Sequence, residues 1–224
     1  MAGIHSSLLP FQNRRQAGQL LAQALPQYAN GGDVIILALP RGGVPVACEV
    51  ADALQVPLDL MLVRKLGTPG QEELAMGAIG QGGIRVLNRD VVQALRISDD
   101  VITAVEQRER RELDRRQQAY RGSRPPPQLR GKRVILIDDG LATGATMRSA
   151  VQAVRAQAPA RIVVAVPLAP AETVDVLRGE ADEVVCLATP EPFMAIGRWY
   201  HEFPQTSDAE VKGLLARAWQ GVQA

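Results

Sequence analysis

The residues best able to do chemistry lie between Val134 and Thr146, in the stretch VILIDDGLATGAT. Four apolar residues, typical of a buried strand, precede two adjacent carboxylates, Asp138 and Asp139, and a loop of small residues follows. Glycine lets the backbone approach a ligand closely, and free N–H groups at a helix start bind phosphate, helped by the helix dipole. Carboxylates repel phosphate, so their partners are neutral hydroxyls or a metal ion. This order of parts predicts a site for a phosphorylated sugar.

Two familiar phosphate motifs do not fit this stretch. It lacks the Gly-Lys-Ser or Gly-Lys-Thr of a Walker A loop, and it lacks GxGxxG. A small-residue loop can also serve only to end a strand and start a helix, and that is the alternative. The full order of apolar strand, acid pair, small loop and two threonines is much less common than such a loop, and it favours a binding site.

The thirteen residues resemble the phosphoribosyl pyrophosphate (PRPP) signature of type I phosphoribosyltransferases. The resemblance implies that Asp138 and Asp139 hold the ribose 2′- and 3′-hydroxyls, and that Thr143 and Thr146 donate side-chain hydrogen bonds to the 5′-phosphate. It implies that PRPP binds as its magnesium complex, with no direct protein ligand to Mg²⁺, which meets the protein through PRPP and the acid pair. The residues implied to cradle the 5′-phosphate are Gly140, Leu141, Ala142, Thr143, Gly144, Ala145 and Thr146.

A second glycine-rich turn, LPRGG at 39–43, follows the first apolar run of the chain. Gly42 and Gly43 expose backbone N–H groups, and Arg41 adds a fixed cation whose fork suits phosphate. The turn resembles the pyrophosphate loop of the same family, which implies a cis peptide between Pro40 and Arg41. A turn with no ligand is the alternative.

A third segment, from Val63 to Ile79, begins with Arg64 and Lys65 and continues through glycines and a proline. It resembles the flexible catalytic loop of the family, and the resemblance implies that these two cations meet the leaving pyrophosphate. An ordinary connection between strands is the alternative. With this segment, the residues expected to act in catalysis are Arg41, Lys65, Asp138 and Asp139.

Enzymes of this family transfer phosphoribose to an acceptor, and two departures from the family pattern leave the identity of that acceptor open. Enzymes that act on 6-oxopurines place an Asp where this chain has Ala142, which argues against hypoxanthine or guanine. The adenine enzymes place a catalytic Glu near the position that Ala75 occupies here, so the sequence does not establish adenine as the acceptor.

The C-terminal stretch 190–207 gathers half of the aromatic and imidazole side chains of the chain. It resembles the tail, containing Trp-Tyr, of a group of uncharacterised phosphoribosyltransferase-like proteins. Phe193, Trp199 and Tyr200 are therefore candidates for stacking on an acceptor base, as part of a hood. The alternative is an apolar plug that packs the C-terminal helix.

Short apolar runs alternate along the chain with segments of helical spacing, which predicts an α/β fold: a doubly wound, mostly parallel sheet of five to six strands with helices on both faces. The resemblance implies the strand order 3-2-1-4-5. Strands are expected over Val34–Leu39, Leu58–Val63, Val134–Ile137, Ile162–Val166 and Val184–Leu187, with Ile84–Leu87 as a weaker sixth. Helices are expected over Arg14–Tyr28, Val44–Leu54, Ser98–Arg121, Thr146–Gln157, Ala171–Leu177 and Asp208–Trp219.

We expect one phosphoribosyltransferase-type domain over 1–224, with a helical insertion over 88–130 and a C-terminal hood and helix over 190–224. The helix predicted over 98–121 carries many opposed charges. Those charges indicate a solvated helix with weak i,i+4 ion pairs, or else an arm that covers a partner or substrate.

Composition excludes several classes of function. The 25 basic residues almost balance the 24 acidic ones, and aromatic residues make up 4%, so nucleic-acid binding is not expected. No apolar stretch is long enough to span a membrane, and the first residues lack the order of a secretory signal, so we expect a cytoplasmic protein with no membrane partner. Cys48 and Cys186 lie in apolar surroundings and are expected to be reduced thiols.

These observations predict a phosphoribosyltransferase that moves 5-phosphoribose from PRPP to a nitrogenous acceptor, such as a base, and releases pyrophosphate. The alternatives are a non-catalytic regulator that binds PRPP or a nucleotide, and a hydrolase or phosphorylase of phosphorylated sugars. Members of the family are commonly dimers, so a homodimer is expected.

Overall fold

The computed structural model describes residues 9–220, and its centre is a five-stranded parallel sheet with the order β2-β1-β6-β7-β8. Every residue of β1 is buried, as a strand covered on both faces requires. Adjacent strands are in continuous parallel register, with Ile36 of β1 opposite Ile135 of β6. The strands are β1 (Val34–Ala38), β2 (Leu58–Leu60), β6 (Arg133–Ile137), β7 (Arg161–Leu168) and β8 (Glu183–Ala188).

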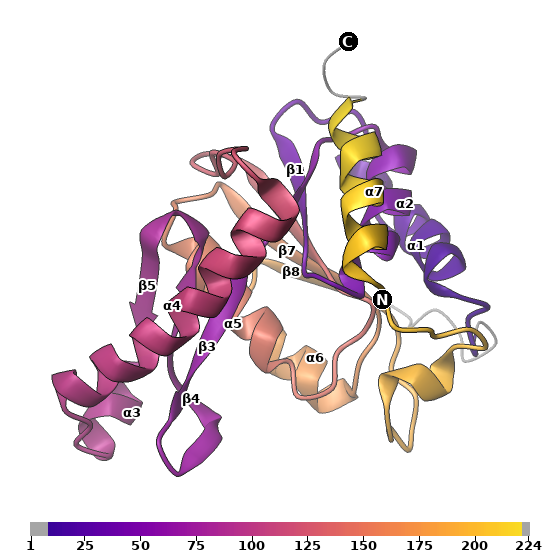
Figure 1. Ribbon diagram of the computed structural model, residues 1–224. Coiled ribbons are helices and arrows are strands. Elements are labelled where there is room, and N and C mark those ends of the chain that lie inside the picture. Colours follow the sequence, from indigo (N-terminus) through magenta and orange to yellow (C-terminus); the bar gives the residue numbers. More distant parts are fainter. Residues whose placement is uncertain (1–8, 221–224) are drawn as a thin grey trace.

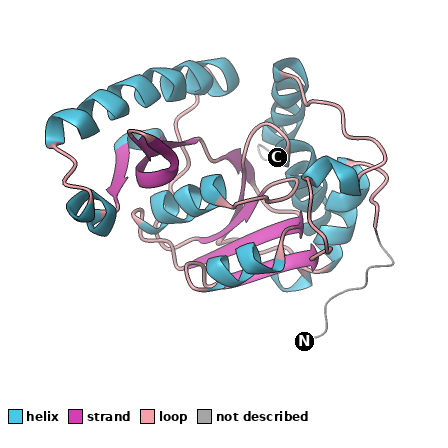
Figure 2. Ribbon diagram, turned by 90° about the horizontal axis from the view of Figure 1, so that it is seen from below, coloured by secondary structure: helices cyan, strands magenta, loops and turns pink. Residues whose placement is uncertain are grey.

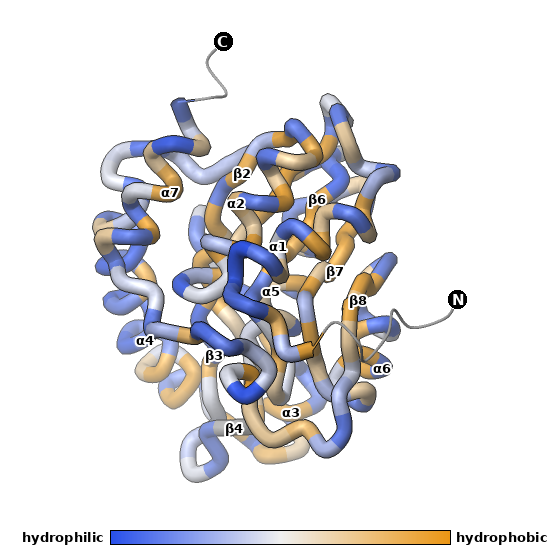
Figure 3. Tube along the Cα trace, turned by 90° about the vertical axis from the view of Figure 1, so that its right-hand side faces the viewer, coloured by the Kyte–Doolittle hydropathy of each residue, from blue (hydrophilic) through white to orange (hydrophobic). Residues whose placement is uncertain are grey.

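Helices cover both faces of this sheet, which confirms the predicted α/β fold. On one face pack α1 (Arg14–Gln23) and α2 (Gly43–Leu54), and on the other α5 (Ala145–Arg155) and α6 (Ala171–Arg178). The C-terminal α7 (Asp208–Gln220) lies beside α2 (Figure 1). Figure 3 shows hydrophobic segments along β7 and β8, whose residues contribute to both cores of the sheet.

A second, antiparallel sheet stands apart from the first, with the order β3-β4-β5. Figure 2 shows the longest helix, α4, running along this small sheet. Ile102 and Leu113 of α4 are buried there. The elements are β3 (Val63–Thr68), β4 (Gln71–Gly80), β5 (Ile84–Leu87), α3 (Arg89–Ala94) and α4 (Asp99–Arg121), and short 3-10 turns occur at Pro26–Tyr28, Gln81–Gly83 and Ile196–Trp199.

Two predictions about the sheets were wrong. Ile84–Leu87 is not a sixth strand of the parallel sheet but pairs antiparallel with β4, and it is only partly buried, unlike strands covered on both faces. The run Leu58–Val63 is divided: β2 ends at Leu60 and β3 begins at Val63 in the other sheet. The implied order 3-2-1-4-5 therefore fails at that edge, but β1 and β6 are neighbours as expected.

The segment from Val63 to Ile79 forms a hairpin and not an open loop. Pro69 and Gly70 occupy the two central positions of its turn, and Gly70 has φ +78°, the left-handed conformation that a type II turn requires there. Leu66 on β3 and Met76 on β4 are fully buried. The segment is therefore regular strand structure, and its expected role as a catalytic loop stays a prediction.

The predicted helical insertion, 88–130, contains α3 and α4, and 190–220 contains a 3-10 turn and α7. Residues 1–8 and 221–224 of the predicted single domain lie outside the described residues. Both cysteines are free thiols, as predicted, with Cys48 buried and Cys186 half-buried. Within 9–220, every helix is too short or too polar to cross a membrane.

Candidate active site at the carboxyl ends of β1 and β6

The loop between β6 and α5 is braced from behind by α6. Gly144, which precedes α5, has φ +70°, and a Cβ there would lie 2.8 Å from Cγ2 of Thr173. The hydroxyl of Thr173 donates to the carbonyl of Ala142 over 2.7 Å. Leu141 donates its N–H to Leu168 at the end of β7 over 3.0 Å. Glycine is therefore needed at position 144 for both conformation and space.

The remaining amides of this loop are available to a ligand. Within residues 9–220, the N–H groups of Ala142, Thr143, Gly144 and Thr146 donate no hydrogen bond. The side chains of Thr143 and Thr146 are exposed. Unpaired donors at the N-terminus of an 11-residue helix, where the helix dipole is positive, suit an anion.

The acid pair lies immediately before these amides. Asp138 is half-buried, and its Oδ1 accepts the N–H of Asp139 over 2.9 Å. Burial and the neighbouring carboxylate of Asp139 raise the pKa of Asp138 well above its ordinary value. Burial also raises the pKa of Asp139, and the guanidinium of Arg14 opposes that rise. Two adjacent acids with raised pKa values are typical of a functional site.

The turn at 39–43 meets the acid pair directly. A Cβ on Gly43 would lie 2.9 Å from Cα of Asp138, and a Cβ on Gly42 would overlap the carboxylate of Asp139. The peptide between Pro40 and Arg41 is cis, as the resemblance implies. The two predicted loops therefore open on one site, because β1 and β6 are adjacent and their carboxyl ends lie at the same edge.

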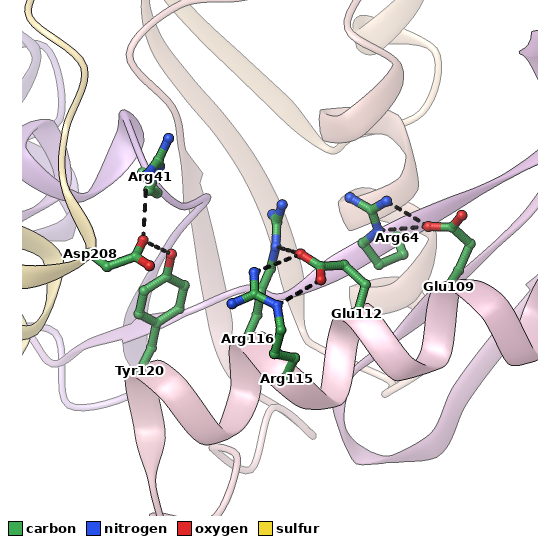
Figure 4. Close-up of polar contacts among 8 residues, drawn as sticks. All are labelled: Arg41, Arg64, Glu109, Glu112, Arg115, Arg116, Tyr120 and Asp208. Atoms are coloured by element: carbon green, nitrogen blue, oxygen red, sulfur yellow. Dashed lines mark hydrogen bonds and ion pairs between the residues drawn. The ribbon is translucent and has the colours of Figure 1, made fainter.

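Two of the predicted cations, Arg41 and Arg64, have acidic partners (Figure 4). Arg41 lies 3.5 Å from Oδ1 of Asp208 on α7, which also accepts the hydroxyl of Tyr120 over 2.7 Å. Arg64 donates to Oε2 of Glu109 on α4 over 2.8 and 2.6 Å. The sequence analysis expected Arg64 to face pyrophosphate and did not foresee that Glu109 would bind it.

The aromatic tail is built around Tyr200. Its ring is 6% exposed, with its centroid 4.8 Å from that of Phe203 and 5.5 Å from that of Phe11. Its hydroxyl donates to the backbone carbonyl of Asp139 over 2.6 Å. These contacts leave no face of Tyr200 for a base, so the plug interpretation describes this residue better than the hood interpretation.

Phe193 and Trp199 are half-buried beside the same core. The indole N–H of Trp199 has no hydrogen-bond partner within residues 9–220. The tail also reaches the signature itself, since a Cβ on Gly140 would lie 2.8 Å from Cγ2 of Ile196. Phe193 and Trp199 therefore remain candidates for contact with an acceptor base, whereas Tyr200 does not.

Sequence reasoning missed Arg14, at the start of α1. Its Nε lies 2.7 Å from Oδ2 of Asp139, although 125 positions separate the two residues. Only 11% of either side chain is exposed. No local spacing connects such distant residues, so the sequence alone carried no signal of this pair.

The acid pair fits a magnesium ion that arrives with its substrate. Carboxylate oxygens are ligands that Mg²⁺ prefers, and the ion commonly completes its shell with water and substrate phosphates. Within residues 9–220, no group of three or more His, Cys, Asp or Glu side chains could hold a metal. Asp138 and Asp139 are therefore the side chains that could contact such an ion, and magnesium at this site stays a prediction.

Comparison with known proteins agrees with this geometry. Residues 6–193 match the family model described as the phosphoribosyl transferase domain. The chain belongs to the phosphoribosyl transferase family. It is 50% identical over 208 residues to two proteins of Mycobacterium tuberculosis, of strains CDC 1551 and H37Rv, each named a putative phosphoribosyl transferase. The match covers 93% of this chain and 47% of each relative, so the chain spans about half the length of these relatives.

A solved structure is also closely similar. The crystal structure of TT1426 from Thermus thermophilus has a TM-score of 0.86 and 43% sequence identity, covering 93% of this chain and 99% of that one. The phosphoribosyl transferase match ends at residue 193, before Trp199 and Tyr200. The two M. tuberculosis relatives and TT1426 match more of the chain than the family model does, so part of their resemblance lies beyond that domain.

Proposed function

We propose that this phosphoribosyl transferase binds PRPP with Mg²⁺ and transfers its 5-phosphoribosyl group to a nitrogenous acceptor, with release of pyrophosphate. The observation that carries the proposal is the set of amides, at 142–144 and 146, that are unpaired within residues 9–220. They lie beside Asp138 and Asp139, and the acid pair lies against the turn at 42–43. The site combines N–H groups that can donate to an anion, carboxylates that can accept from hydroxyls, and a second glycine turn. This combination matches a sugar that is phosphorylated at two places.

Each end of PRPP has its own partner in this proposal. The 5′-phosphate accepts hydrogen bonds from the free amides of the signature and from Thr143 and Thr146. The ribose hydroxyls donate to Asp138 and Asp139. The pyrophosphate lies on the turn at 42–43, next to Arg41, with Lys65 of β3 as a second cation.

The chemistry is a displacement at the anomeric carbon with inversion. The bond from that carbon to the pyrophosphate oxygen breaks, a bond to the acceptor nitrogen forms, and the proton of that nitrogen passes to water or to an oxygen of the departing pyrophosphate. Positive charge grows on the ribose ring, where the acid pair stabilises it, and negative charge grows on pyrophosphate, where Arg41 and the amides of 42–43 stabilise it. Magnesium, when bound with PRPP, neutralises charge on the departing pyrophosphate.

The acceptor is proposed only as a class. Ala142 provides no carboxylate for a 6-oxopurine, and Tyr200 is closed to stacking by its own neighbours. Phe193 and Trp199 are the aromatic candidates, and the partnerless indole N–H of Trp199 suits an acceptor that offers an oxygen or an aromatic nitrogen.

A second candidate is a regulator that binds PRPP or a nucleotide without turnover. The pairing of Arg64 with Glu109 favours it, because an arginine held by an acid contributes less to the charge on leaving pyrophosphate. The same fold and the same binding residues would serve this function.

A test of turnover is a screen of purines, pyrimidines and small amines with Mg·PRPP, with released pyrophosphate as the readout. The phosphoribosyltransferase proposal predicts release with at least one acceptor, and none from the variant Asp138→Asn/Asp139→Asn. Exchange of labelled pyrophosphate into PRPP in the presence of that acceptor would then show that the reaction is reversible transfer. Tight PRPP binding with no release from any acceptor would favour the regulator.

A further inference from the structure

Two segments from opposite ends of the chain form a clasp, defined here as residues 11–14 and 199–204. Phe11 donates its N–H to the carbonyl of Trp199 and accepts from His201, each over 2.9 Å. Gln12 accepts the N–H of Glu202 over 2.9 Å. The clasp is therefore held by backbone hydrogen bonds, which fix the position of its side chains.

The clasp holds Asp139 at two points. The guanidinium of Arg14 bonds the carboxylate, and the phenol of Tyr200 bonds the backbone carbonyl, over 2.7 and 2.6 Å. Burial raises the pKa of Tyr200, so this phenol remains a donor at neutral pH. Asp139 is thus fixed at both its side chain and its main chain by residues outside the signature.

Arg14 is itself fixed from two further directions. Its second nitrogen donates to the carbonyl of Pro204 over 2.7 Å, and its guanidinium carbon lies 3.8 Å from the ring centroid of Phe203. A planar guanidinium that is stacked on one face and bonded at its edges has little freedom to rotate. Such a group is well suited to orient a carboxylate.

We propose that Arg14 is a positioning residue for the sugar site and that, with Tyr200, it sets the orientation of Asp139. This rests on the proposed function. Oδ2 of Asp139 is taken by Arg14, so a ribose hydroxyl meets Oδ1. The tail then acts by supporting the acid pair, a different role from the acceptor hood expected from its aromatic residues.

The test is calorimetric titration of Mg·PRPP into the whole chain and its Arg14→Met variant, below the melting temperature of both. Removing one charge-assisted partner of Asp139 should weaken the affinity roughly 10- to 100-fold. Tyr200→Phe keeps the ring and loses only the hydroxyl, so a smaller loss is expected. Arg14→Lys keeps the charge without the fork, and it should recover part of the affinity lost in Arg14→Met.

Two control variants separate positioning from folding. Arg15→Met removes the neighbouring arginine of α1, which pairs with Glu49 and is 75% exposed. Gln12→Met removes a clasp contact to Glu202 that does not touch Asp139. Both should bind Mg·PRPP as the unaltered chain does, whatever their melting temperatures.

The outcomes distinguish the two proposals. PRPP binding by the unaltered chain with an undiminished affinity in Arg14→Met overturns the role of Arg14 and leaves the proposed function standing. An affinity that follows melting temperature across all variants, controls included, also overturns it. No PRPP binding by the unaltered chain overturns the proposed function and this inference together. If Arg14→Met does not fold, the comparison of Arg14→Lys with the two controls decides in the same way.

Discussion

The signature region, residues 133–147, and the hairpin region, residues 63–121, differ in whether their polar groups have partners within the protein. In the signature region two carboxylates are adjacent, and several amides have no hydrogen-bond partner in the part of the chain that the structure describes. In the hairpin region several charges are paired: Arg64 pairs with Glu109, and Arg85 with Glu106. Amides without a protein partner at a helix N-terminus and carboxylates with raised pKa values indicate a ligand, whereas paired charges indicate structural support.

A buried ion pair joins the hairpin region to the main sheet. Arg121, at the end of α4, bonds Asp59 of β2, and only 4% of either residue is exposed. Arg121 also donates to the carbonyl of Pro125 over 2.6 Å. Breaking a buried pair leaves an uncompensated charge, so this contact ties the end of α4 to the sheet.

Among single substitutions, the largest effect on binding is expected where the turn at 39–43 meets the signature. In Gly42→Ala the new methyl would overlap the carboxylate of Asp139, so that Asp139 or the turn must move. We expect the affinity for Mg·PRPP to fall roughly 30- to 100-fold, as for the loss of a hydrogen bond to a charged group. Titration calorimetry measures this.

The control is Gly32→Ala, because a Cβ there would have no heavy atom within 4 Å. It should bind as the unaltered chain does. An unchanged affinity in Gly42→Ala would mean that the signature region does not depend on close contact with the turn at 42–43.

A smaller effect, and on stability only, is expected in the hairpin region. Glu109→Gln removes the carboxylate that binds Arg64 and should lower the free energy of unfolding by about 1–2 kcal/mol. PRPP affinity should not fall, since Arg64 becomes free to meet pyrophosphate. Thermal melting and calorimetry on the same variant separate the two results.

Glu112→Gln is the matched control on the same helix. Its partners Arg115 and Arg116 lie on α4 and lower the pKa of Glu112 to about 2. Such pairs contribute only about 0.3–0.5 kcal/mol each. A large loss of PRPP affinity in Glu109→Gln would contradict the assignment of the hairpin pairs to structure.

The smallest effect is a pH-dependent gain in stability from Asp138→Asn. The raised pKa of Asp138 means that the unfolded chain, with an ordinary value of 3.8, releases this proton first. The native state therefore loses stability as pH rises above about 4, until the folded group has also ionised. Asn carries no such penalty, so without ligand the melting temperature of the variant should exceed that of the unaltered chain by more at neutral than at acid pH.

Asp182→Asn provides a control of opposite sign. The pKa of Asp182 is lowered although burial opposes this, because the N–H of Ile162 and the guanidinium of Arg155 hold its charge. Its stabilising effect is present above its unfolded pKa and is lost as pH falls, so this variant should be most destabilised at neutral pH. A parallel pH response of the two variants would contradict the raised pKa at the signature.

The parts that sequence predicted well are those with strong local patterns. Buried strands read as continuous apolar runs, and β1, β6, β7 and β8 were found in this way. The acid pair and the glycine loop lie in one stretch of chain, so their adjacency was already present in the sequence.

The features that the sequence analysis missed depend on contacts between distant residues or on a tight turn that was interpreted as an open loop. Pro69-Gly70 is a strong signal for a type II turn, but the surrounding glycines suggested an open loop. Arg14 and Asp139 are joined only by the fold, and the same holds for Arg64 and Glu109. Helical spacing accounted for the segments that carry Arg14 and Glu109, and it gave no sign of their ion pairs.

The most direct test of the central claim is titration of Mg·PRPP into the unaltered chain and into Asp138→Asn/Asp139→Asn. The account predicts saturable binding at one site by the unaltered chain and a loss of at least about 100-fold in the double variant, because two charged acceptors of the ribose are removed. Equal affinities would show that the adjacent aspartates do not hold the sugar, and the assignment of the site would be wrong.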